Sequence, residues 1–299
     1  MLGKLLYFIN INFGKYFFKN PNTLYHNIFN KLHLNLIANK KLYDEEIKQY
    51  VKKGFFKTNI NSFNFSRDIS LEIKKQTIDK NKSSVSFQIN DVMKNKIKKH
   101  INEEFEILLK KLEKFYNSKI SVANVEIRRN FYINENINKE VYSNYYHVDH
   151  YVYNHFKIFI NLADVNIDQG PLHIYSKDDT KKFMKFNNYK NRSNYINKEL
   201  NKYLVTNTGK IGESFLANTT ECLHKAGVVK KGNFRDMLFI TFVTIPEPID
   251  DDLKDFFYYE KKYPQSIWKH DKEVVKIAKP QSLRKTISLF LKYYKNKLN

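Results

Sequence analysis

The sequence has few of the residues that mark secreted, membrane-spanning or low-complexity proteins. It contains a single cysteine, Cys222, which excludes an internal disulfide and leads us to expect a reducing, cytoplasmic compartment. Only 8 glycines and 6 prolines occur in 299 residues, which excludes a collagen-like or linker-rich chain. No run of about 18 apolar residues is present, so the sequence predicts no transmembrane helix.

The chain is instead rich in lysine and in aromatic side chains. Lys and Arg number 52 against 31 Asp and Glu, a formal net charge of +21, while 42% of residues are hydrophobic and 15% aromatic. That apolar content is enough for a sizeable core and excludes wholesale disorder. The lysines are scattered along the chain, which favours solvated surfaces over a nucleic-acid-binding arm. A basic surface for an anionic substrate, lipid or nucleic acid is the alternative.

The first nineteen residues are apolar and basic, but Asn10 and Asn12 interrupt the run and no signal-peptide cleavage site follows. Two interpretations stay open for this amphipathic stretch. It is either a helix packed on the core or a helix lying on an anionic membrane surface, with its lysines near the headgroups. The second would make the protein peripheral to the membrane.

The spacing of apolar residues divides the chain into three parts. It is helical from Tyr43 to Lys53 and from Ile89 to Tyr116. Short runs rich in Val, Ile, Phe and Tyr then predict strands over Ile120–Ile133, Tyr151–Val165, Gly170–Tyr175, Ser214–Ala217 and Met237–Thr244. Helical spacing returns near the C-terminus, between Leu283 and Leu291.

This order predicts a mixed α+β protein. Several short strands with few long helices between them favour a β-sandwich or barrel over a parallel βαβ sheet. We expect a mainly helical segment over 1–119, a β core over 120–246 and a basic helical extension over 247–299, together forming one composite domain.

The most informative motif is His147-Val-Asp149. In an extended chain, residues two apart point to the same face, so His147 and Asp149 project together. An imidazole and a carboxylate side by side are two of the three ligands of a facial triad, which binds Fe(II) and leaves the opposite positions open. Alone, the motif is a weak signal, because His-x-Asp occurs often by chance in a chain with nine histidines. It is more typical of a surface pair or a hydrogen-bonded core histidine, so a third ligand is needed.

Two later features strengthen the motif. The segment Asp168-Gln-Gly-Pro-Leu172 makes a tight turn between two strand-like runs. Further on, His224 is followed eleven residues later by Arg235, at the start of another strand-like run. The guanidinium fork of an arginine on the next strand suits capture of a carboxylate beside a metal pocket.

Taken in order, these four features resemble the phytanoyl-CoA dioxygenase-like family of Fe(II)/2-oxoglutarate-dependent oxygenases, over roughly residues 120–245. The resemblance implies a double-stranded β-helix, a jelly-roll or cupin-like core with flanking N- and C-terminal helices. It implies that O2 and 2-oxoglutarate are consumed, with succinate formed as a small or carrier-linked organic substrate is hydroxylated. If the excess lysines cluster around the pocket mouth or on one face, the substrate or docking surface would be anionic.

The resemblance also implies roles for individual residues. His147, Asp149 and His224 would bind Fe(II), Arg235 would pair with the distal carboxylate of 2-oxoglutarate, and Asn130 would touch the same cosubstrate. The main alternative is a catalytically silent jelly-roll module that binds an anionic partner such as nucleic acid or a lipid surface. It predicts salt-dependent binding that survives loss of His147 and Asp149.

The sequence leaves open the orientation or role of several other residues near the motif. Residue 226 is Ala, where relatives often carry a Ser that helps to hold 2-oxoglutarate. We expect His155 to be structural or to line the substrate pocket. Of Arg128 and Arg129, one should face solvent, while Lys157 could line the pocket or face outward.

Overall fold

The computed structural model describes residues 44–79, 82–116, 118–133, 140–149, 155–186, 202–246, 257–260 and 275–278. The amphipathic N-terminal stretch and the helix expected near residues 283–291 lie outside these ranges. Within the described ranges, every helix is too short or too polar to cross a lipid bilayer.

Helices predominate in the first part of the described chain, and strands predominate after residue 118. The helices are α3 (Glu45–Lys53), α4 (Phe63–Lys74), α5 (Asp91–Glu104), α6 (Glu106–Tyr116) and α7 (Lys177–Phe186), with the short 3-10 helix η1 (Ile167–Gln169). The strands are β1 (Phe55–Lys57), β2 (Ser84–Ser86), β3 (Ser118–Phe131), β4 (His155–Asn161), β5 (Leu172–Ile174), β6 (Val205–Asn207), β7 (Ser214–Ala217), β8 (His224–Ala226), β9 (Phe234–Pro246), β10 (Phe257–Glu260) and β11 (Val275–Ala278). The structure is therefore a mixture of helices and antiparallel sheets, as the sequence predicts.

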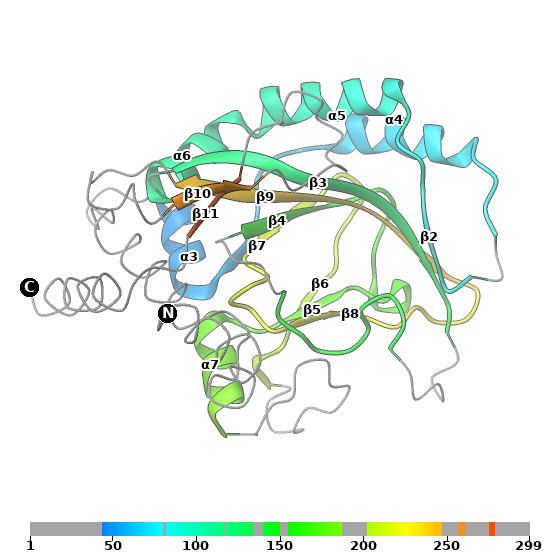
Figure 1. The fold of residues 1–299 in the computed structure, drawn as a ribbon. Coiled ribbons are helices and arrows are strands. Elements are labelled where there is room, and N and C mark those ends of the chain that lie inside the picture. The colour runs from blue at the N-terminus through cyan, green and yellow to red at the C-terminus, as the bar shows by residue number, and fades with distance from the viewer. Residues whose placement is uncertain are drawn as a thin grey trace, which may run out of the picture.

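Two of the sheets determine where the site lies. The larger has six strands in the order β1-β7-β4-β9-β3-β2, and the smaller has three in the order β6-β5-β8. All of their pairings are antiparallel. In Figure 1 the helices α4, α5 and α6 lie above the larger sheet, and the smaller sheet lies below it.

The two faces of the larger sheet differ because side chains alternate along a strand. On β3, Val125 and Ile127 belong to the main apolar core. On β4 and β9, Ile158 and Ile240 do the same, and both are fully buried. These residues pack against apolar side chains of α3 to α6, such as Ile97. The helical layer thus covers one face of the sheet and leaves the other toward β5 and β8.

Capping residues define the two ends of α3. The side chain of Asp44 caps α3 by accepting a hydrogen bond from the Ile47 amide, and Gly54 ends it with φ of 87°. The single helical stripe that we expected from Ile89 to Tyr116 is two helices, broken at the buried Phe105. Buried apolar residues continue on both sides of the break, with Ile101 on α5 and Leu108 on α6 in the same core as Phe105.

Two short segments beyond residue 246 are described, and both are strands. These strands, β10 and β11, pair antiparallel with Phe257 opposite Ala278. Aromatic and β-branched residues dominate these two segments, Phe-Tyr-Tyr-Glu and Val-Lys-Ile-Ala, and such residues favour strands.

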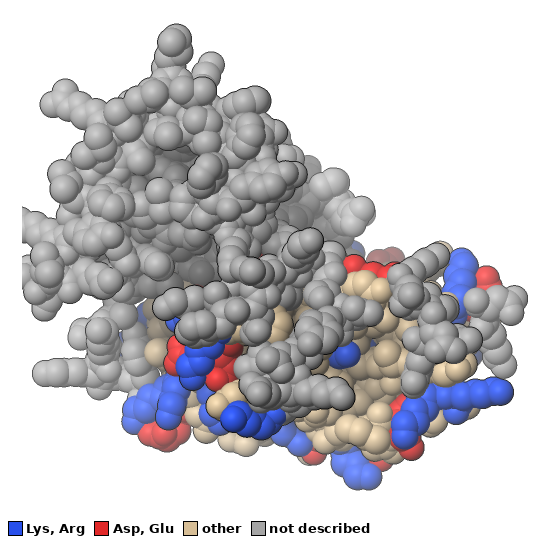
Figure 2. All heavy atoms as spheres, turned by 90° about the horizontal axis from the view of Figure 1, so that it is seen from below, with Lys and Arg blue, Asp and Glu red and all other residues tan. Residues whose placement is uncertain are grey.

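The described charges are mixed over the visible surface. On the face shown in Figure 2, Lys and Arg side chains lie scattered, several of them beside Asp or Glu. This view shows no continuous basic patch among the described residues. A contact with an anionic membrane stays a prediction.

Candidate metal and cosubstrate site

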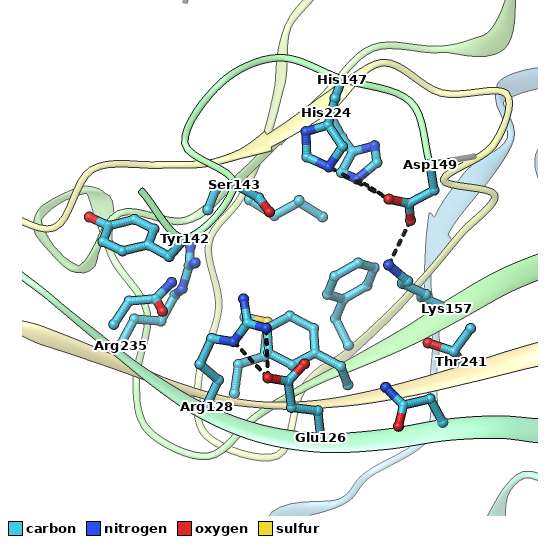
Figure 3. A pocket seen from close by; sticks show the side chains of 17 residues that line it. Glu126, Arg128, Tyr142, Ser143, His147, Asp149, Lys157, His224, Arg235 and Thr241 are labelled. Carbon is cyan, nitrogen blue, oxygen red and sulfur yellow. Dashed lines mark hydrogen bonds and ion pairs between the residues drawn. The ribbon is translucent and has the colours of Figure 1, made fainter. Parts of the chain in front are cut away.

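A cavity of about 200 Å³ lies between the two sheets. Its polar lining comes from β3, β4, β8 and β9 and from the loop before Asp149: Asn124, Glu126, Arg128, Asn130, Tyr142, Ser143, His147, Asp149, Lys157, His224, Arg235 and Thr241. Figure 3 shows these side chains converging from both sheets. The cavity therefore contains every site residue that the sequence predicts.

His147, Asp149 and His224 come together at one edge of the cavity. Their candidate ligand atoms all lie within 4.8 Å of one another. Among the described residues, these three side chains form a cluster that could hold a metal ion. Asp149 Oδ1 is 3.6 Å from His147 Nε2 and 3.9 Å from His224 Nε2. This set of two imidazoles and one carboxylate could hold a metal ion.

The backbone fixes the two histidines in place. The amide of His147 donates to the His224 carbonyl at 2.9 Å, and the amide of His224 donates back at 2.9 Å. The Asp149 amide donates to the carbonyl of Thr219 at 2.8 Å. The extended segment with the His-x-Asp motif is thus held against β8 and the turn before it.

Hydrogen bonds also select the tautomer of each histidine. Nδ1 of His147 donates to the Tyr145 carbonyl at 2.8 Å, and Nδ1 of His224 donates to the Cys222 carbonyl at 2.9 Å. A proton held on Nδ1 leaves the Nε2 lone pair free toward Asp149. Burial lowers the pKa of His224 to about 3, so this imidazole is neutral and ready to ligate.

Asp149 is kept ionised in spite of its burial. Burial alone would raise its pKa, but Lys157 and the neighbouring histidines outweigh that effect and hold the pKa well below the usual range. Lys157 Nζ donates to Oδ2 at 2.6 Å, and His155 Nε2 lies 3.4 Å from the same oxygen. A charged carboxylate is the form that a metal requires.

Arg235 is a buried cation on the opposite side of the cavity. It is 3% exposed, and burial lowers its pKa to about 10. Its Nη1 donates to the Gly170 carbonyl, while its Nε has no hydrogen-bond partner in the described part of the chain. Among the described residues no carboxylate forms an ion pair with it. A buried charge without a partner is costly, so this position favours an anion.

The turn before β5 needs a glycine to supply that carbonyl. Gly170 has φ of 65°, and a Cβ there would lie 2.6 Å from the carbonyl oxygen of Gly227. A side chain would therefore push apart the two chain segments beside Arg235. This explains the glycine within the Gly-Pro-Leu motif.

Asn130 lies beside Arg235, because the two residues are directly opposite each other in the β3–β9 ladder. It is buried, and its Oδ1 accepts a hydrogen bond of 2.8 Å from the hydroxyl of Ser84. That contact uses the carbonyl end of the side chain. The amide nitrogen is the group that stays available to a ligand in the cavity.

The structure places the residues whose positions the sequence left open. Lys157 lines the cavity, and so does Arg128, whose guanidinium donates to Glu126 Oε1 at 2.6 and 2.9 Å. Arg129 instead pairs with Asp236, and its side chain is only 14% exposed. The expectation that one of the two adjacent arginines faces solvent is therefore wrong, because Arg128 lines the cavity and Arg129 is held in an ion pair.

Sequence reasoning missed Tyr142 and Ser143. Both line the cavity, and both have positive φ, 42° and 62°. Residues other than glycine rarely adopt this conformation, which is more frequent at binding sites. The Ser143 carbonyl accepts the amide of Ala226, so a serine lies across from the position where the sequence has alanine.

Comparison with known proteins gives no family for this chain. No protein-family model matches it, and no curated protein sequence does. The resemblance to the phytanoyl-CoA dioxygenase-like family therefore stays a prediction from the motifs.

Solved structures do align with it. The epimerase SnoN, in a complex with Fe3+, alpha ketoglutarate and nogalamycin RO, aligns with a TM-score of 0.48 at 9% identity, over 83% of this chain and 95% of that one. HygX from Streptomyces hygroscopicus, with nickel and 2-oxoglutarate bound, aligns with a TM-score of 0.48 at 10% identity, over 68% and 87%. The carbocyclase SnoK from nogalamycin biosynthesis has a TM-score of 0.41 at 13% identity, over 69% and 85%. Similarity at this level assigns no metal, cosubstrate or reaction to this chain.

Proposed function

We propose that the chain is an Fe(II)- and 2-oxoglutarate-dependent oxygenase with a double-stranded β-helix core. One observation carries the proposal: a single cavity holds a His-Asp-His set and a buried arginine that lacks a carboxylate among the described residues. Two antiparallel sheets on either side of that cavity support the jelly-roll part of the proposal.

The residues present fit a divalent iron. His147 and His224 would each offer Nε2, and Asp149 would offer Oδ1, which leaves the remaining positions of the metal open to small ligands. The backbone carbonyls that accept from Nδ1 of each histidine keep both rings oriented.

The residues also fit 2-oxoglutarate. Its distal carboxylate would accept hydrogen bonds from the Arg235 fork, including the Nε that has no described partner. Asn130, beside Arg235 in the ladder, would donate to the same carboxylate. The buried arginine thereby gains the anion that its surroundings do not supply.

The iron and the cosubstrate would supply the oxidising chemistry, in which O2 and the decarboxylation of 2-oxoglutarate to succinate are coupled to hydroxylation of a substrate C–H bond. The chain would bind and orient the partners and limit the access of water. Its substrate would be a small or carrier-linked organic molecule, and a reducing, cytoplasmic location would suit both Fe(II) and the buried Cys222.

Anaerobic titration with Fe(II) and 2-oxoglutarate tests the proposal. We expect a weak visible charge-transfer band in the wild type, loss of the band in His224→Gln, and retention in His100→Gln, which replaces a buried histidine outside the cavity. Arg235→Gln should raise the 2-oxoglutarate concentration needed by about 10- to 100-fold, because a charged hydrogen bond contributes about 1.5–3 kcal/mol.

A wild type that is folded by circular dichroism but gives no band would overturn the oxygenase proposal. Binding of an anionic partner that is unchanged by His224→Gln would then favour the catalytically silent module.

A further inference from the structure

The cavity lining has more cationic side chains than carboxylates, and Lys157 is one of the cations. Three cationic side chains, Arg128, Lys157 and Arg235, line it against two carboxylates, Glu126 and Asp149. Arg128 and Glu126 form their own two-contact pair. Lys157 therefore has only Asp149 as its carboxylate partner among the described residues.

Asp149 cannot serve Lys157 and a metal equally well. Its Oδ1 faces the two histidines, and its Oδ2 accepts from Lys157 Nζ at 2.6 Å. A divalent cation at the triad would draw the carboxylate charge toward itself and repel the nearby ammonium group. The Lys157 side chain is only 20% exposed, so water alone compensates its charge poorly.

The cosubstrate does not resolve this imbalance. Figure 3 shows Arg235 and Lys157 on opposite sides of the cavity, with Asp149 beside Lys157 and the two histidines along the edge between Asp149 and Arg235. The distal carboxylate of 2-oxoglutarate pairs with Arg235 in the function proposed above, and its other end belongs at the metal. Lys157 is then the cation on the remaining side, where a substrate would lie.

We propose that Lys157 binds an anionic group of the substrate, a carboxylate or a phosphate, once a metal occupies the His-Asp-His set. The substrate is then an organic anion whose charged group lies beside Lys157 and whose reacting carbon lies near the metal. This inference rests on the proposed function and narrows its substrate to an anionic class. Lys157 is thus a specificity-determining residue.

A purely structural role for Lys157 makes a different prediction. If the lysine only positioned Asp149, its loss would weaken metal binding and leave anion binding unchanged. An anion bound directly to the metal would likewise be insensitive to Lys157. Metal affinity and anion affinity must therefore be measured separately.

Competition with a chelator first measures the Zn(II) affinity of the wild type and of each variant. Each full-length protein is then saturated with Zn(II), which is redox-inert, and with 2-oxoglutarate. Inorganic phosphate and, separately, acetate are titrated into it by calorimetry. We expect at least one anion to bind, with Lys157→Gln weakening binding at least tenfold and Lys157→Arg keeping it within about threefold. The anion that binds more tightly tells whether the substrate carries a phosphate or a carboxylate.

Lys210→Gln is the matched control, because Lys210 also pairs with an aspartate, Asp164 at 2.9 Å, but is exposed and outside the cavity. It should bind the anions like the wild type.

The inference is overturned if neither anion binds the wild type, or if Lys157→Gln binds them equally well. The Fe(II)/2-oxoglutarate band distinguishes failure of this inference from failure of the oxygenase proposal. If the wild type and Lys157→Gln both give a normal band but anion binding does not depend on the lysine, only the proposed anionic substrate is rejected. If the wild type gives no band, the oxygenase proposal is rejected as well.

Discussion

The two faces of the larger sheet use the same strands for opposite purposes. Along β3, Val125 and Ile127 join the apolar core under the helices, while the residues that alternate with them line the cavity: Asn124, Glu126, Arg128 and Asn130. On β9, Ile240 packs in the core and Thr241 lines the cavity. The apolar face stabilises the fold. The cavity face carries polar groups, and burying them lowers the stability of the folded state.

One wall of the cavity is therefore formed by rigid strands. The side chains beside the candidate metal site lie on strands whose other face is anchored by α4, α5 and α6. Such anchoring keeps cavity residues oriented without apolar packing inside the cavity. Mutations on the two faces should therefore affect different measurements, binding on one and unfolding on the other.

The largest effect should come from a metal ligand. We expect His147→Ala to weaken Fe(II) or Co(II) binding by about 1000-fold, the equivalent of about 4 kcal/mol, because few protein ligands share the whole free energy of metal binding. Equilibrium metal titration measures it. The free energy of unfolding without metal should fall by only about 1 kcal/mol, and metal affinity within tenfold of the wild type would contradict the assignment.

The opposite face should show the reverse pattern. Ile240 is fully buried, so Ile240→Ala should lower the free energy of unfolding by about 3 kcal/mol through lost burial and a residual cavity. Urea unfolding measures this, and the folded variant should keep the Fe(II)/2-oxoglutarate band. Thr241→Ala, one residue further along β9, is the control and should cost about 1 kcal/mol or less. Equal costs at the two positions would remove the distinction between the faces.

Much of the cavity face could be predicted from the sequence because strand alternation is a local property. His147 and Asp149 are two residues apart on an extended segment, and the structure brings their side chains together. Arg235 begins a strand and reaches the cavity. Ser214–Ala217 was predicted as a strand, and it forms β7 with those bounds.

Other features depend on packing that no local pattern contains. Lys157 lies on β4, where nearly every residue is buried on one face or the other, so alternation does not indicate which way the lysine points. The break at Phe105 has no glycine or proline to mark it. Tyr142 and Ser143 adopt left-handed conformations usually taken by glycine. These positions follow from the tertiary structure.

His100, a buried residue of α5, allows the stability of the helical layer to be tested by pH. His100 stacks on Phe65 at 4.0 Å, and its Nε2 lies 2.7 Å from the Ser62 hydroxyl. Burial lowers its pKa from 6.5 to about 4. The folded state therefore favours the neutral ring, and its contribution to stability is full above pH 6.5 and is lost as pH falls toward 4.

Between pH 7.5 and pH 5 this histidine should cost the protein about 2 kcal/mol of unfolding free energy. Urea unfolding at both pH values measures the loss, which should be smaller by about that amount in His100→Gln. Because His224 also has a lowered pKa, the difference between wild type and variant is the relevant quantity. The same loss in both proteins would show that His100 is not the group responsible.

The smallest effect tests whether Asn130 contributes to cosubstrate binding. If its amide donates to the carboxylate that Arg235 binds, Asn130→Ala should weaken 2-oxoglutarate binding about fivefold, since a hydrogen bond contributes about 1 kcal/mol. Ser84→Ala removes the hydroxyl that donates to Asn130 Oδ1 and should have a smaller effect in the same direction, because it loosens the amide without deleting it. Titration of Fe(II)-loaded protein measures both. If Asn130→Ala lowers stability but leaves 2-oxoglutarate affinity unchanged, Asn130 only joins β2 to β3, and cosubstrate binding on this side of the cavity depends on Arg235.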